Sequence, residues 1–373
     1  MSKVYIFQTK NSNQVYQHLK EVSLRIDKDT VLIKPNIVIP AKTSSAVVTD
    51  VHLVEAIVKY LKARGVKRII IGEAPGLNVD VELAFKVSGF ARLAQKEKLE
   101  LLNLEKTDTI EKPWKFGKIK IPKIVFESYY INVPKLKTHM QTLVTLGLKN
   151  QKGLLRSEYK KGFHITWGLD EPIAELAKIV KPDLTIVDGI VGIEGDGPLL
   201  QGKRIKSHVC IIGEDVVSVD ATCCRVMGID PFSVPHINIA SKIGVGEMEP
   251  EIAGDQIEKV KRNFKLPNME YFKMFKLFNI RTKQACSMCS DSLREAMRMT
   301  LSSPVLFIKY MPKWIYLILF KGVQFTAGAK PLVKEGKGKV ICLGKCSKRF
   351  AEEYGYCLAS GCPPSPEEIL KSL

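Results

Sequence analysis

The sequence predicts an α/β protein with a mainly parallel sheet flanked by helices, in a Rossmann-like arrangement, followed by a smaller cysteine-rich, basic C-terminal module. From residue 3 to about residue 245, short runs rich in Val and Ile alternate with segments of helical spacing, a pattern typical of βαβ units. Beyond Ile252 the pattern changes to short basic segments with many Phe and Met, and then to cysteines. We therefore place the two domains at residues 1–251 and 252–373.

The elements of the first domain follow from hydrophobic periodicity, with β-branched runs for strands and apolar residues three or four apart for helices. The expected strands cover residues 3–8, 30–38, 66–76, 99–105, 118–127, 129–137, 183–192 and 207–215. The expected helices cover residues 13–26, 50–65, 80–98, 142–150, 171–181 and 218–229.

The net charge of +18 is concentrated near the C-terminus. Residues 256–373 hold 21 Lys and Arg against 9 Asp and Glu, a difference of +12. This bias favours an anionic partner, which could be a small molecule, an acidic electron-transfer protein or a membrane surface, and a merely soluble basic surface is the alternative. We do not expect nucleic acid, because the sequence has no interleaved aromatic platform and no helix-turn-helix pattern.

The first residues, MSKVYIFQTKN, lack the long apolar run of a signal peptide, so we expect a cytoplasmic protein. In a reducing compartment, nine cysteines favour metal or redox chemistry over disulfides. The most apolar stretch, residues 304–325, is interrupted by Lys309, Pro312 and Lys313. The uninterrupted part, residues 314–320, is far shorter than the roughly 20 apolar residues that a bilayer span takes, and we expect either core packing or peripheral membrane contact.

Polar and glycine-rich segments follow four strands of the first domain. They are KPN (residues 34–36), GEAPG (72–76), PKLKTH (134–139) and DGIVGIEGDGP (188–198), and a fifth segment, LGLKNQKGLL, adds Lys149 and Asn150. Each alone could be an ordinary turn. Because ligands of open parallel sheets bind beyond the carboxyl ends of the strands, their coincidence predicts a crevice for an anionic small molecule.

Within this crevice we assign roles by residue type. Lysine ammonium groups and side-chain amides suit an anionic ligand, whereas carboxylates and a histidine suit proton transfer. The expected substrate-binding residues are Lys34, Asn36, Lys137, Lys149 and Asn150, and the expected catalytic residues are Glu73, His139 and Asp188. Neither a GxGxxG nor a P-loop motif is present, so no dinucleotide or ATP site is predicted.

The cysteines of the C-terminal module suggest a metal centre. A zinc ribbon needs a second CxxC pair, which the sequence lacks, whereas an iron–sulfur cluster accepts scattered thiolates. Our choice of ligands for one [4Fe–4S] cluster, with zinc as the alternative, is Cys286, Cys289, Cys346 and Cys362. Cys342 lies in an alternating strand pattern and is expected to face inward, and Cys357 is a spare thiol, although either could replace a chosen ligand.

With these residues in view, the chain resembles the DUF362 family of uncharacterised iron–sulfur centre proteins. The resemblance covers roughly Val31 to Pro231 and runs through VLIKPN, IIIGEAPG, INVPKLKTHMQTLVTLGLKNQKG, IVDGIVGIEGDGPLLQG and VVSVDATCCRVMGIDP. It implies no general reaction. Many members carry an insert with two CxxCxxC runs, which this sequence lacks.

The C-terminal tail is similar to the end of the small subunits of respiratory complex I and nickel–iron hydrogenases. There, the cysteines of GxC and GCPP ligate a [4Fe–4S] cluster, which implies the same role for Cys346 and Cys362. The upstream pair in that family is adjacent, whereas Cys286 and Cys289 are separated by two residues. We expect an iron–sulfur oxidoreductase acting on an anionic small molecule. The alternative is a non-catalytic electron-transfer or binding module that docks on an acidic protein or a membrane surface.

Overall fold

The computed structural model describes residues 2–77, 79–267, 287–317, 319, 322–328, 333 and 338–373. The chain forms two compact units, Met1–Lys160 with Leu169–Pro267, and Lys161–Gly168 with Asn268–Leu373. The boundary expected at residues 251 and 252 falls inside a strand, Glu251–Gly254, that pairs in parallel with the first strand of the chain. This pairing keeps the following residues with the first unit, so the predicted boundary lies too early.

The first unit contains the predicted α/β fold. Its strands are β1 (Lys3–Gln8), β2 (Thr30–Pro35), β3 (Arg68–Glu73), β4 (Glu100–Asn103), β5 (Thr109–Trp114), β6 (Gly117–Pro122), β7 (Tyr129–Val133), β8 (Lys135–His139), β9 (Leu143–Val144), β10 (Leu184–Glu194), β11 (Lys203–Gly213) and β12 (Glu251–Gly254). The main sheet has the order β12-β1-β11-β10-β7-β2-β3-β4, and β8 and β9 extend it beside β10. All pairs from β10 to β4 along this order are parallel, which confirms the expected fold class.

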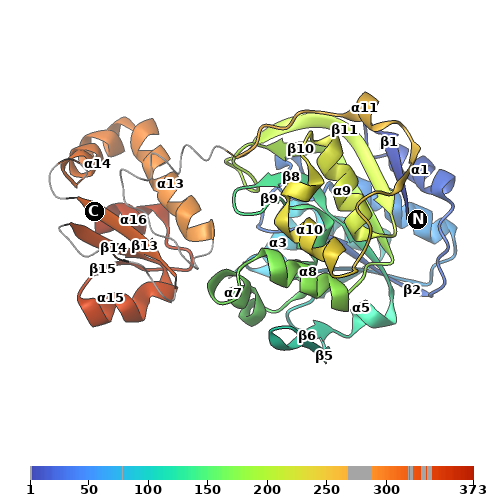
Figure 1. Cartoon of the computed structure of the whole chain (residues 1–373), viewed down its shortest axis with the longest axis horizontal. Coiled ribbons are helices and arrows are strands. Elements are labelled where there is room, and N and C mark those ends of the chain that lie inside the picture. The colour runs from blue at the N-terminus through green and yellow to red at the C-terminus, as the bar shows by residue number, and fades with distance from the viewer. Residues whose placement is uncertain are drawn as a thin grey trace. The chain divides into compact units, whose positions relative to one another are not determined.

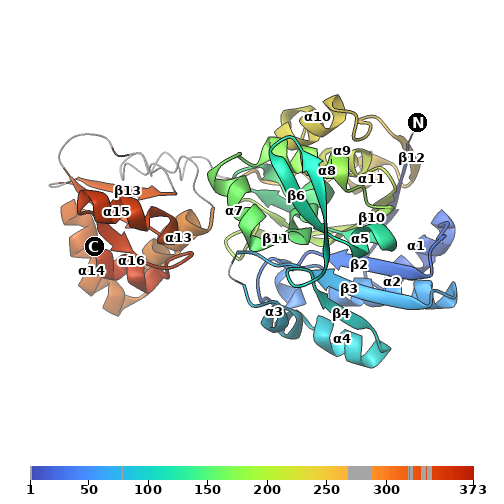
Figure 2. The same cartoon turned by 90° about the horizontal axis from the view of Figure 1, so that it is seen from below.

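Helices cover both faces of this sheet. The helices up to residue 267 are α1 (Gln14–Val22), η1 (Thr43–Ser45), α2 (Val51–Ala63), α3 (Val81–Ser88), α4 (Phe90–Glu97), α5 (Ile124–Glu127), α6 (Leu146–Asn150), η2 (Gln151–Leu154), α7 (Ser157–Ile165), α8 (Asp170–Ile179), α9 (Val216–Val226), η3 (Pro231–Ser233), α10 (Pro235–Lys242) and α11 (Ile257–Val260). Figure 2 shows α2 and α4 on one side of the sheet and α8, α9 and α10 on the other. This two-sided cover explains the runs of consecutive buried residues in β2, β3 and β7.

Two predicted helices differ from those observed. The helix expected at residues 80–98 is split at Gly89, whose φ of 87° ends α3 and begins α4. The helix expected at 142–150 is a short strand, β9, followed by the short helix α6. Leu143 and Leu146 there have φ of 61° and 48°, in the left-handed region that costs a non-glycine residue on the order of 1 kcal/mol. Neither of these two positions is a glycine, so the sequence did not mark the left-handed turns.

The second unit contains a parallel three-stranded sheet in the order β13-β14-β15. Its elements are α13 (Ser287–Ser302), α14 (Pro304–Tyr316), β13 (Val323–Ala327), β14 (Lys339–Leu343), η5 (Lys345–Ser347), α15 (Lys348–Tyr354), β15 (Cys357–Ala359) and α16 (Pro366–Ser372). Figure 1 shows α13 and α14 on one side of the strands and α15 on the other.

Alternation along β14 builds the two cores of this unit. Ile341 and Leu343 pack with residues of α13, α14 and α16, including Trp314, whose ring lies 5.7 Å from that of Phe325. Val340 and Cys342 point to the other face and pack with α15. The predicted inward position of Cys342 is therefore confirmed. No helix in the described part of the chain is long and apolar enough to cross a membrane.

Candidate functional site

A buried ion pair joins the ends of β2 and β3. Lys34 is the fifth residue of β2 and Glu73 the last of β3, and the two strands are neighbours, so both side chains reach the same edge of the sheet. The Nζ of Lys34 lies 2.9 Å from Oε1 and 3.0 Å from Oε2 of Glu73, and both residues are at most 2 % exposed. Burial lowers the pKa of Lys34 and raises that of Glu73, and their mutual attraction opposes both shifts.

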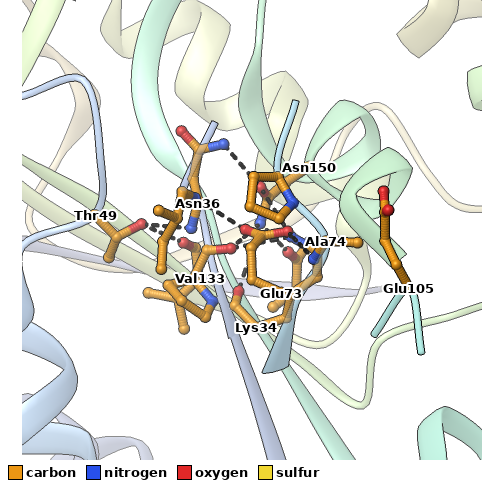
Figure 3. A network of polar contacts seen from close by, with 12 residues as sticks. Lys34, Asn36, Thr49, Glu73, Ala74, Glu105, Val133 and Asn150 are labelled. Atoms are coloured by element: carbon orange, nitrogen blue, oxygen red, sulfur yellow. Dashed lines mark hydrogen bonds and ion pairs between the residues drawn. The ribbon is translucent and has the colours of Figure 1, made fainter. Parts of the chain in front are cut away.

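Asparagine side chains connect this pair to the neighbouring elements. The Oδ1 of Asn150, at the end of α6, accepts a hydrogen bond of 3.1 Å from Asn36 Nδ2 and a longer one of 3.5 Å from Lys34. Its Nδ2 donates to Asn132 Oδ1 on β7 at 2.8 Å. Figure 3 shows Lys34, Asn36, Glu73 and Asn150 directed toward one another. The structure therefore brings four of the predicted site residues into one polar network.

Lys137 joins the same network from β8. Its Nζ donates to Asn36 Oδ1 at 2.6 Å and to the carbonyl of Val47 at 2.7 Å, and the residue is fully buried. Within the described residues it forms no ion pair with a carboxylate. Burial, followed by repulsion from Lys149 and Lys135, holds its pKa well below the usual lysine range.

The chain passes so close to the ion pair that only glycine fits at residue 153. A Cβ at Gly153, in η2, would lie 2.4 Å from Glu73 Oε1 and 2.6 Å from Lys34 Nζ. The backbone also closes over the pair, because Ala74 donates its N–H to the Gly153 carbonyl at 2.9 Å. Lys34 and Glu73 are thus enclosed by protein, and their contacts are internal ones.

Asp220 fixes α6, which carries Lys149 and Asn150. Its two carboxylate oxygens accept the backbone N–H groups of Gly147 and Leu148 at 2.7 and 2.8 Å, which satisfies the first turn of the short helix. Asp220 is completely buried on α9, and burial raises its pKa to about 7 against the opposing effect of these hydrogen bonds. The sequence prediction missed this residue, although an aspartate within the apolar run VVSVDATCC was a usable signal.

Lys149 and His139 form the partly exposed end of the site. The Nζ of Lys149 lies 2.9 Å from Nε2 of His139. His139 is 2 % exposed, whereas Lys149 keeps part of its side chain at the surface. The other ring nitrogen of His139, Nδ1, accepts the backbone N–H groups of Gln141 and Thr142 at 3.1 and 3.3 Å. Burial lowers the pKa of Lys149 to about 8.

Asp188 is placed differently from the other predicted residues. It is fully buried in β10, where its Oδ2 pairs with Lys135 Nζ at 2.7 Å and accepts the backbone N–H of Asp50 at 2.7 Å. None of its hydrogen bonds goes to the Lys34–Glu73 network within the described residues. A catalytic role for Asp188 stays a prediction, and its contacts define an adjacent ion pair.

A second histidine, not predicted from the sequence, lies near Lys149. His236 of α10 is completely buried, and its Nδ1 lies 3.3 Å from Oδ1 of Asp170 at the start of α8. Its Nε2 has no hydrogen-bond partner in the described structure. Burial, and to a smaller extent the positive charge of Lys149, lower the pKa of His236, whereas Asp170 raises it. A lone histidine after a proline gave no sequence pattern that pointed to this position.

A surface hollow of about 680 Å³ lies away from these residues. It is lined by parts of η1, α2, α3 and α4, including His52, Glu55, Arg92 and Lys96. Glu55 pairs there with Lys59 and Lys96, which lowers its pKa to about 2. None of the predicted site residues lines this hollow, so we base the candidate site on the polar network.

The segments that carry three of the predicted thiol ligands meet near the carboxyl ends of β14 and β15. Cys346 follows β14, Cys362 follows β15, and Cys289 lies in the first turn of α13. A Cβ at Gly344, whose φ is 85°, would lie 3.0 Å from Cys289 Sγ and 3.4 Å from the Gly361 carbonyl. This small cradle joins the three segments that carry these cysteines.

The fourth predicted ligand, Cys286, lies outside the described residues. Among the residues that the structure does describe, no three His, Cys, Asp or Glu side chains are grouped so as to hold a metal ion. The soft thiol donors and the glycine cradle suit an iron–sulfur cluster, and the ligand set stays a prediction. The predicted spare thiol, Cys357, is half-buried, and its Sγ lies 3.6 Å from the carbonyl of Ser372.

The fold and the network define an α/β protein with a lysine-rich polar site at the strand ends. The chain belongs to the family described as a domain of unknown function, DUF362, whose model matches residues 31–225. It is 26% identical over 250 residues to a thylakoid-associated protein of Synechocystis, covering 65% of this chain and 77% of that protein.

A crystal structure of a protein from Thermotoga maritima is also similar, with a TM-score of 0.36 and 14% identity. The match covers 63% of this chain and 60% of that one, so this chain spans less than two thirds of that protein's length.

Proposed function

We propose that this protein is an iron–sulfur oxidoreductase that acts on an anionic small molecule at the strand ends of its first unit. The observation that carries the proposal is the convergence of Lys34, Glu73, Lys137 and Asn150 on one buried network, with the partly exposed Lys149 next to Asn150 in α6. Lys149 would meet the ligand, and His139 would hold or move a proton at its Nε2. The enclosed residues would keep these two side chains in place.

A polycarboxylate or a phosphate suits this site, so binding of citrate and of inorganic phosphate tests it directly. We expect calorimetric titration to detect binding of at least one of them to the wild type, and K149A to weaken it by tenfold or more, the loss of about one hydrogen bond. K118A, which removes a lysine from an exposed pair with Glu111, is the matched control. Equal affinity of wild type and K149A, or no binding of either anion, would overturn the assignment of the site.

For the second unit we propose one [4Fe–4S] cluster held by Cys286, Cys289, Cys346 and Cys362, with zinc as the alternative metal. When bound, such a cluster supplies one-electron transfer. The chain's own contribution is to bring three of these segments around Gly344 and to keep the sheet core behind them dry.

Anaerobic reconstitution with iron and sulfide, followed by visible absorption and electron paramagnetic resonance, tests the cluster. We expect C289S, C346S and C362S each to lose the cluster signal and C342S to retain it, since Cys342 packs on the opposite face of β14. A colourless protein that holds stoichiometric zinc would exclude the cluster. Retention of the signal in C362S would show that the ligand set is wrong.

One observation favours a second function, docking on a membrane surface. The outer face of α14 exposes Val305 and Ile308, which are 74 % and 76 % exposed, beside the exposed Lys309 and Lys313. An apolar stripe bordered by lysines suits an anionic lipid surface. The thylakoid association in the name of the Synechocystis relative is consistent with such a role. We propose a cytoplasmic protein that contacts a membrane peripherally through α14, with an acidic redox protein as the alternative partner.

A further inference from the structure

The hydrogen bonds of His139 determine which atom of the Lys149–His139 pair carries the proton. The Nδ1 of His139 accepts two backbone N–H groups, from Gln141 and Thr142, so it holds a lone pair and no hydrogen. In a neutral imidazole the proton must then be on Nε2. The Nε2–H therefore points at Lys149 Nζ, 2.9 Å away.

An ammonium group cannot accept this hydrogen bond. A protonated lysine has three N–H donors and no lone pair, whereas a neutral amine has one. The contact between His139 and Lys149 is thus satisfied only when Lys149 is the neutral amine and accepts from Nε2–H. This contact favours the neutral amine, the form of Lys149 that can act as a nucleophile once the hydrogen bond opens.

Burial of Lys149 favours this protonation state. No carboxylate forms an ion pair with Lys149 in the described part of the chain. Asp170 of α8 raises the pKa of Lys149 by charge attraction, and the charge of Lys149 lowers the pKa of Lys137 on β8. The positive charge of Lys149 in turn lowers the pKa of His236 of α10. Burial brings the pKa of Lys149 to about 8, so that at pH 7 about two orders of magnitude more neutral amine is present than for an ordinary lysine.

The partly exposed position of Lys149 separates it from the other buried lysines. Lys34, Lys135, Lys137 and Lys160 are at most 2 % exposed, and their Nζ atoms are occupied by internal acceptors. Lys149 keeps part of its side chain at the surface. Lys149 is thus, unlike these four lysines, partly accessible from solution.

We propose that Lys149 is a reactive amine that condenses with the carbonyl group of a small oxo acid to form an imine, and that His139 assists by donating and recovering a proton at Nε2. The choice of an anionic ligand rests on the proposed function of the same site. The amine nitrogen bonds to the carbonyl carbon, and the C=O bonding pair moves to oxygen. The two protons of the nitrogen pass to the oxygen and the carbon–oxygen bond breaks. The products are an imine on Lys149 and one molecule of water.

The proposal can be tested with glyoxylate, which carries both an aldehyde and a carboxylate. Any imine formed is reduced with cyanoborohydride, and the modified lysines are located by peptide mass spectrometry. At about pH 7 we expect Lys149 to be labelled at least tenfold faster than Lys67 and Lys118, whose side chains are 73 % and 75 % exposed. The Lys149 labelling rate should level off above about pH 8, while the rates at Lys67 and Lys118, whose pKa values are raised by their carboxylate partners, continue to rise.

Variants and a neutral aldehyde separate this inference from the proposed function. H139Q should slow labelling at residue 149 severalfold. Propionaldehyde, which has no carboxylate, should still label Lys149 if the reactive amine is correct and the anionic ligand is not. Binding of citrate or phosphate without faster labelling of Lys149 by either aldehyde would overturn the reactive amine and leave the anion site intact. Fast labelling by propionaldehyde with no advantage for glyoxylate would retain the amine and refute the anionic substrate. The comparison of labelled lysines in the wild type needs no variant, so misfolding of H139Q would not prevent the test.

Discussion

The ammonium group of Lys34 lies within 3.0 Å of both carboxylate oxygens of Glu73, and the pair is sealed from solvent by the backbone at Gly153. Removing one partner of such a pair leaves an uncompensated buried charge, which costs more than the pair contributes when intact. The pair therefore fixes the ends of β2 and β3 relative to each other, and through Asn150 it fixes α6 as well.

We predict that E73Q lowers the free energy of unfolding by about 3–5 kcal/mol. The substitution keeps the shape of the side chain and leaves Lys34 without its counter-charge. K34M should be similarly destabilising, and the double variant K34M/E73Q should lose less than the sum of the two. Urea denaturation followed by circular dichroism measures all three. D29N, which breaks the exposed Lys67–Asp29 pair, should change stability by no more than about 1 kcal/mol, and additive losses in the double variant would contradict the coupling.

Asp220 should make stability depend on pH. Its pKa is raised to about 7 in the folded chain, compared with about 3.9 when unfolded. Between these values the folded state binds the extra proton, so the stability that this proton contributes is complete below about pH 4 and is lost as the pH rises through about 7. D220N cannot titrate at this position. The free energy of unfolding of the wild type should therefore fall relative to that of D220N as the pH rises through this window. A constant difference across the window would show that Asp220 titrates normally.

The strand ends could be predicted from the sequence because sheet geometry alone brings them together. Lys34, Asn36 and Glu73 follow neighbouring parallel strands, so their proximity required only the order of β2 and β3. Lys34 and Glu73 neutralise each other because both side chains are buried, and the sequence pattern does not encode how deeply a strand end is buried. The expected exposure of these lysines to a ligand is retained only at Lys149.

The residues that the sequence prediction missed lie on helices whose positions depend on packing. Asp220 reaches α6 from α9, 72 and 73 residues away along the chain, and Asp170 reaches His236 across α8 and α10. Side-chain periodicity places such residues on a helix face but does not say which helix faces them. Leu146, at the start of α6, has a left-handed backbone conformation that its residue type does not predict.

The titration of His236 tests its contact with Asp170. Burial lowers its pKa below the usual value, while the hydrogen bond and charge of Asp170 raise it. D170N should therefore lower the pKa of His236 further and shift its Nδ1 resonance, measured by nitrogen-15 nuclear magnetic resonance of histidine-labelled protein. E171Q, which removes the neighbouring carboxylate that pairs with Lys115, should leave both unchanged. An unchanged His236 titration in D170N would mean that the two side chains do not interact in solution.

The exposed stripe of α14 leads to the last prediction. Val305, Ile308, Pro312 and Ile315 recur every three or four residues and are exposed, whereas Tyr310 and Trp314 on the opposite side are packed against the sheet. Burying two apolar side chains in a lipid surface contributes roughly 1.5–3 kcal/mol each. We expect the full chain to co-sediment with vesicles that contain phosphatidylglycerol, and V305S/I308S to lose at least tenfold in affinity without a change in melting temperature.

The matched control for this variant is L200S, which removes a residue of similar exposure, 68 %, from the first unit. It should bind vesicles as the wild type does. Raising the salt concentration should weaken binding of the wild type, because salt screens the attraction that Lys309 and Lys313, which border the stripe, would have for lipid phosphates. Equal sedimentation of V305S/I308S and wild type would exclude α14 as the contact. Binding that is equally strong to neutral phosphatidylcholine would retain the apolar contact and refute the contribution of the two lysines.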